Sequence, residues 1–71
     1  MTKDELSRLQ GYLRKTFGAP TLEVRAQPKK TDMAEIFING DFVAALYRID
    51  EDGEVEDQLQ MAILEMDLEE A

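Results

Sequence analysis

Two short apolar runs that flank Asn39-Gly40 constrain the fold more than any other feature of this sequence. Asn-Gly suits a type I′ turn, in which both central residues have positive φ angles, and such turns join the strands of β-hairpins. We therefore predict a hairpin with strands over about 33–38 and 41–49. The chain has 71 residues, which is room for one hydrophobic core, so the remaining elements must pack on this hairpin.

The predicted hairpin is mostly apolar on both sides. With a two-residue turn and a regular ladder, Phe37 lies opposite Phe42 and Met33 lies opposite Leu46, and opposed residues share a face. One face then carries Ala34, Ile36, Ile38, Val43, Ala45, Tyr47 and Ile49, and the other carries Met33, Glu35, Phe37, Phe42, Ala44 and Leu46. A single helix can cover only one of these two faces.

The first residues predict a helix over about 3–17. Thr2 and Glu5 have the spacing of a capping box, in which each side chain accepts a hydrogen bond from the other residue's backbone. Gly18 can end the helix in the left-handed conformation, and Pro20 cannot continue it. The helix would present one apolar face to the hairpin, made of Leu6, Leu9, Leu13 and Phe17.

Two further segments complete the predicted sheet. Residues 21–27 alternate between apolar and polar side chains, as in a half-buried strand. Residues 55–64 allow two interpretations: their composition slightly favours a helix, whereas the Asp52-Gly53 turn just before them favours a strand. We choose the strand, followed by an acidic tail over 65–71. The sequence thus predicts a single α+β domain over residues 1–71, in which an N-terminal helix packs on an antiparallel β-meander in the order α-β-β-β-β.

The side-chain inventory argues against catalysis. Without cysteine or histidine, the chain has no thiol nucleophile and no imidazole base, and the same absence disfavours a zinc site. Its four glycines are scattered, so there is no glycine-rich phosphate loop. We therefore expect no enzymatic activity, no cofactor and no metal site. The cysteine-free composition fits the cytoplasm, and no apolar run is long enough to span a membrane.

Charge is distributed unevenly along the chain. The net charge is −8, but residues 1–32 hold seven of the eight basic residues, and residues 33–71 hold twelve of the sixteen acidic ones. An acidic chain repels phosphate backbones, so nucleic-acid binding is disfavoured. A weaker alternative is a patch for nucleic acid or an anionic ligand on the N-terminal helix, formed by Arg8, Tyr12 and Lys15. A solvated helix face explains the same residues.

Three stretches of the chain resemble a known family: TKDELSRLQGYLRKTFGAP at 2–20, FINGDFVAALYRIDEDGEVED at 37–57 and LQMAILEMDLEE at 59–70. The resemblance covers nearly the whole chain, and its most specific parts are residues 52–55 and 60–64. The family consists of short uncharacterised proteins from alphaproteobacteria and is a domain of unknown function. The resemblance implies a stand-alone bacterial cytoplasmic protein and supplies no catalytic or binding residues.

The face of the hairpin that the helix leaves uncovered is the best candidate for a functional surface. It carries the apolar side chains of Met33, Phe37, Phe42 and Leu46, which need a cover. The cover is the C-terminal segment of the same chain, a second copy in a homodimer, or another protein. We therefore predict a protein–protein interaction or accessory module. We expect Phe37→Glu or Leu46→Glu to dissociate a complex and to leave a folded monomer.

Overall fold

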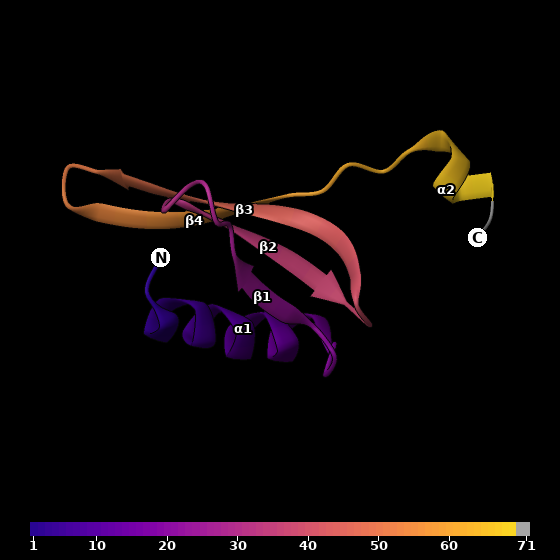
Figure 1. The fold of residues 1–71 in the computed structure, drawn as a ribbon, viewed down its shortest axis with the longest axis horizontal. Helices are drawn as coiled ribbons and strands as arrows, with labels where there is room; N and C mark the ends of the chain where they lie inside the picture. The colour runs from indigo at the N-terminus through magenta and orange to yellow at the C-terminus, as the bar shows by residue number, and fades with distance from the viewer. Residues whose placement is uncertain (70–71) are drawn as a thin grey trace.

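The computed structural model describes residues 1–69 of the chain. They form α1 (Lys3–Phe17), β1 (Glu23–Ala26), β2 (Met33–Ile38), β3 (Asp41–Glu51), β4 (Glu54–Gln60) and α2 (Glu65–Glu69). The four strands form one antiparallel sheet in sequence order, and α1 lies against one side of it (Figure 1). This arrangement confirms the predicted α+β class and the order α-β-β-β-β. The predicted acidic tail begins with α2, and its last two residues lie outside the described residues.

The local signals at both ends of α1 act as the sequence predicts. The backbone N–H of Thr2 donates to Oε1 of Glu5 at 2.7 Å, and the N–H of Glu5 donates to the Thr2 hydroxyl at 3.1 Å. At the other end, Gly18 adopts a φ of 60°, which glycine reaches without the strain that a side chain would cause. Both ends of the helix are therefore set locally, and α1 spans the predicted residues 3–17.

The hydrophobic core lies between α1 and the sheet. Seven buried side chains form it: Leu13, Leu22, Val24, Ala34, Ile36, Ala44 and Leu46. The strand residues among them come from β1, β2 and β3, whereas every side chain of β4 is exposed or only partly buried. The core therefore rests on three strands, and β4 extends the sheet beyond it.

A β-bulge at the start of β3 changes which side chains face α1. Asn39 and Gly40 have φ angles of 55° and 83°, as a type I′ turn requires, and Phe37 lies opposite Phe42 as predicted. The next pair joins Ile36 to Ala44, so that β3 carries one extra residue at this point. Beyond this point, each side chain of β3 faces the side of the sheet opposite to the predicted one.

The predicted faces of β3 are therefore wrong beyond the bulge. Ala44 and Leu46 are buried in the core under α1, although the regular ladder placed them on the uncovered side. Tyr47 lies opposite Met33 and so belongs to the side that α1 does not cover, together with Ala45 and Ile49. The bulge thus buries the fully apolar Leu46 rather than Tyr47, whose hydroxyl would need a hydrogen-bond partner in the core.

The strand interpretation of residues 55–64 is correct for its first part. β4 pairs with β3 from Glu51↔Glu54 to Ala45↔Gln60, and the ladder stops there, beside the bulge. β1 is shorter than the predicted 21–27, and β3 extends two residues beyond the predicted 41–49. Residues 61–64 continue unpaired to α2, which lies well apart from α1 (Figure 1). In the described part of the chain, no helix is long and apolar enough to cross a membrane.

Candidate interaction surface

Large apolar side chains are exposed mainly in the C-terminal third of the chain. Seven of the ten such side chains in the described residues lie between residues 55 and 68, and each is 44–63 % exposed. These seven are Val55, Leu59, Met61, Ile63, Leu64, Met66 and Leu68. Single exposed apolar residues are ordinary in monomers, but a concentration of them in one segment is typical of an interaction surface.

The position of β4 explains why its apolar side chains stay exposed. Leu59 lies directly opposite the buried Leu46, so it points to the side of the sheet on which α1 lies. Val55 lies four residues before Leu59 on the same side, because side chains alternate along a strand. The core under α1 is built on the other three strands, so Val55 and Leu59 stay exposed on this face, on either side of Asp57.

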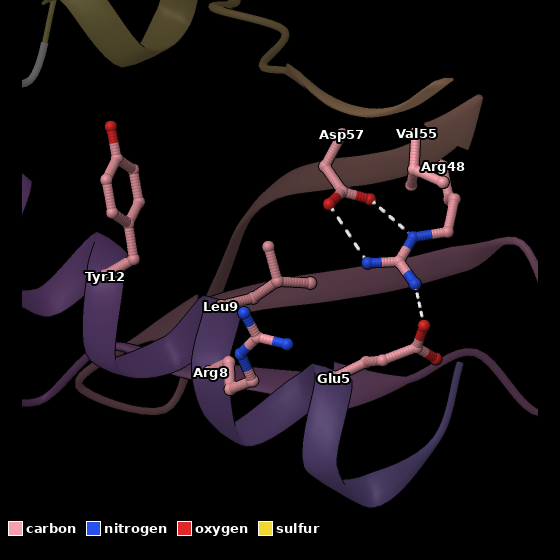
Figure 2. Close-up of a pocket in the computed structure, with 7 residues that line it drawn as sticks. All are labelled: Glu5, Arg8, Leu9, Tyr12, Arg48, Val55 and Asp57. Carbon is pink, nitrogen blue, oxygen red and sulfur yellow. Dashed lines mark hydrogen bonds and ion pairs between the residues drawn. The ribbon is translucent and has the colours of Figure 1, made fainter. Parts of the chain in front are cut away.

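Two hollows lie in a row between α1 and β4. The first has a volume of about 480 Å³ and is lined by Glu5, Arg8, Leu9, Tyr12, Arg48, Val55 and Asp57 (Figure 2). The second has a volume of about 350 Å³, and all ten of its lining residues are apolar. Leu13 and Phe17 of α1 stand on one side of it, and Leu59 and Met61 stand on the other. We call the two hollows together the α1–β4 groove.

Arg48 holds the first hollow in shape by joining three elements. Its Nε and Nη2 donate to the two carboxylate oxygens of Asp57 on β4, at 2.9 and 3.1 Å, and its Nη1 donates to the Glu5 carboxylate on α1 (Figure 2). Such a bidentate pair fixes the orientation of both partners. The hydrogen bonds with Asp57 raise the pKa of the Arg48 guanidinium further above its ordinary value. The network ties the outer end of the β3–β4 hairpin to the first turn of α1.

The Glu5 carboxyl has a lowered pKa in this network. The backbone N–H of Thr2 and, after it, the Arg48 guanidinium hold the pKa of Glu5 below its ordinary value of 4.5. A carboxyl group with a lowered folded-state pKa stabilises the fold above its unfolded pKa, and this contribution is lost as the pH falls through the folded-state value.

We expect Glu5→Gln to be less stable than the parent above pH 4.5 and to approach the parent's stability at pH values below the lowered pKa of Glu5. Urea unfolding followed by circular dichroism over the acidic range tests this. The control is Glu51→Gln, which removes an exposed carboxylate at the end of β3. A loss of stability in Glu5→Gln that stays the same at every pH would contradict the role of the ionised carboxylate.

The structure separates the four residues of the predicted interaction surface. Met33, Phe37 and Phe42 lie on the side of the sheet that α1 does not cover. The rings of Phe37 and Phe42 pack edge to face, with 5.8 Å between their centroids. Leu46 is 2 % exposed and belongs to the core, so it is not part of an exposed surface, and we now expect Leu46→Glu to unfold the chain. The Arg25 guanidinium lies 4.0 Å from the centre of the Phe37 ring and partly covers it.

The predicted anionic patch is only partly assembled. Arg8 and Tyr12 line the first hollow, but Lys15 does not (Figure 2). The carboxylates of Glu5 and Asp57 line the same hollow and would repel an anion. This arrangement offers less to an anionic ligand than the sequence pattern indicates.

Sequence reasoning missed the apolar residues of β4 and of the segment that follows it as a surface. The sequence shows that Leu59, Met61 and Ile63 alternate on one face of a strand. The predicted helix packs on the hairpin, so no other predicted element is left to cover these side chains.

Comparison with known proteins gives a family but no characterised relative. A family model described as "Protein of unknown function (DUF3126)" matches residues 5–67. No curated protein and no solved structure matches the chain. The family match covers α1 from Glu5 onward, all four strands and the start of α2.

Proposed function

The chain belongs to the DUF3126 family of proteins of unknown function, and we propose that it is a non-enzymatic protein–protein interaction module of the cytoplasm that self-associates. The seven exposed apolar side chains between residues 55 and 68 carry this proposal. The lack of cysteine and histidine removes the commonest nucleophiles and bases and so supports a non-catalytic role. The cysteine-free composition also suits a reducing compartment.

The exposed apolar area sets the expected strength of self-association. Full burial of one large aliphatic side chain is worth about 1.5–3 kcal/mol, and roughly half of each of the seven is exposed. Burying these exposed parts on two copies would contribute about 10–20 kcal/mol, against about 4–15 kcal/mol for the freedom lost on association. The difference of roughly 5 kcal/mol corresponds to a dissociation constant of about 0.2 mM.

Sedimentation equilibrium between about 5 μM and 1 mM should therefore show the molar mass rising from that of one chain to that of two. Raising the salt concentration should leave this change in place, because apolar burial is not screened by ions. A single chain at every concentration would refute self-association. A complex that dissociates as salt is added would mean that charge pairs, and not the apolar side chains, hold it together.

Binding of nucleic acid or of another anionic ligand through α1 is the alternative. Only the joint position of Arg8 and Tyr12 at the first hollow supports it. The net charge of −8 opposes it. Affinity for a labelled single-stranded oligonucleotide that falls steeply with added salt would favour this alternative over self-association.

A further inference from the structure

We propose that the α1–β4 groove of one copy binds residues 62–69 of a second copy, and that the exchange is reciprocal. We call residues 62–69 the C-terminal arm. This inference rests on the proposed self-association and specifies which surfaces meet. The same segment entering the same groove on both copies gives a closed dimer with two-fold symmetry.

The second hollow of the groove is open to an apolar occupant. Its floor consists of core side chains, among them Leu22 and Ile36, so the hollow reaches the hydrophobic core. Phe17 and Leu59 stand on opposite walls and are 57 % and 44 % exposed. Apolar side chains that enter here would cover both walls and complete the core on the β4 side.

The C-terminal arm carries side chains that need such a site. Ile63, Leu64, Met66 and Leu68 are all exposed, and α2 buries none of its residues. Leu64 directly precedes α2, and Met66 and Leu68 lie within it. A helix of five residues is marginal in water by itself, so packing against another surface would stabilise α2.

The course of the chain indicates that a second copy supplies the arm. Met61 follows β4 directly and already stands on one wall of the second hollow. From this point the chain runs away from α1 and ends in α2 (Figure 1). Leu64 and Asp67 there line a different hollow, beside Phe42 and Tyr47. To fill its own groove the arm would have to reverse direction immediately after Met61, whereas an arm from another copy can enter from outside.

Three single substitutions test this arrangement in the full chain by sedimentation equilibrium. Leu68→Glu places a charge on the arm, and Phe17→Glu places one on the groove wall. Phe42→Glu is the contrasting variant, because Phe42 is 55 % exposed and lines, with Leu64 and Asp67 of the same chain, a separate hollow outside the α1–β4 groove. We expect Leu68→Glu and Phe17→Glu each to raise the dissociation constant about tenfold or more, and Phe42→Glu to change it less than about threefold.

Mixing the two defective chains gives the decisive result. In a reciprocal exchange, the Phe17→Glu chain keeps an intact arm and the Leu68→Glu chain keeps an intact groove. The mixture should therefore form a heterodimer with one intact arm–groove contact, at concentrations where each variant alone is a monomer. Circular dichroism of each variant checks the fold, and Leu59→Glu on the opposite wall replaces Phe17→Glu if that chain is unfolded.

The outcomes separate this inference from the proposed function. A parent chain that stays monomeric refutes both. A parent dimer that persists in Leu68→Glu and Phe17→Glu, or that dissociates in Phe42→Glu, keeps self-association and refutes the arm exchange. Two weakened variants whose mixture forms no heterodimer would also refute the exchange, because the intact arm and the intact groove would then not recognise each other.

Discussion

Leu46→Ala is expected to lower the free energy of unfolding by about 2–4 kcal/mol, which is a large part of the stability of a domain of this size. Leu46 is 2 % exposed and packs in the core between α1 and the sheet. Removal of its side-chain carbons loses their burial and leaves a cavity that surrounding side chains fill only in part. Urea unfolding followed by circular dichroism, at about 5 μM chain so that it is monomeric, measures the change.

The matched control is Leu59→Ala, because Leu59 lies directly across the β3–β4 ladder from Leu46 and is 44 % exposed. It should lose less than about 1 kcal/mol in the monomer, since the removed atoms were already half in water. A small loss in Leu46→Ala would mean that Leu46 lies on the uncovered side of the sheet, as a regular ladder would place it. Equal large losses in both variants would mean that something covers β4 as well.

Elements whose signals are local were predicted accurately. The capping box at Thr2 and the left-handed Gly18 lie next to the ends that they set, and α1 has the predicted bounds. The turn at Asn39-Gly40 likewise required only positive φ angles at these two residues, and it starts the hairpin in the predicted register.

The bulge in β3 could not be predicted because the residues around it are almost interchangeable in pattern. Val43, Ala44, Ala45 and Leu46 are all apolar, so neither alternation nor propensity marks where one extra residue enters. The choice is made by packing against α1, where Leu46 can be buried without cost and Tyr47 cannot. This contact joins residues that are far apart in the sequence, and a single sequence does not show it.

The same bulge explains the end of β4. The β3–β4 ladder ends at Ala45↔Gln60, and the irregular backbone beside Val43 offers no continuous partner for residues 61–64. The predicted strand over 55–64 is therefore too long. The released residues become part of the exposed apolar segment, which is why the candidate surface lies along β4 and the C-terminal arm, in addition to the predicted sheet face.

Ala34→Leu should lower the free energy of unfolding by about 1–3 kcal/mol through overpacking. Ala34 is 0 % exposed and lies in the core opposite Leu46. A leucine there adds three carbons where no space is left, so it must displace α1 or push neighbouring side chains out of their preferred rotamers. Thermal unfolding followed by circular dichroism should show a midpoint lower by about 4–20 °C.

The matched control for this prediction is Ala45→Leu. A regular ladder would place Ala45 on the same face as Ala34, whereas the bulged ladder places it on the opposite side, across from Glu35 and Gln60. A leucine on that open side should change stability by no more than about 0.5 kcal/mol. Equal losses of stability from both substitutions would mean that β2 and β3 pair in a regular ladder without the bulge. Tyr47 would then lie under α1 with its hydroxyl in the core.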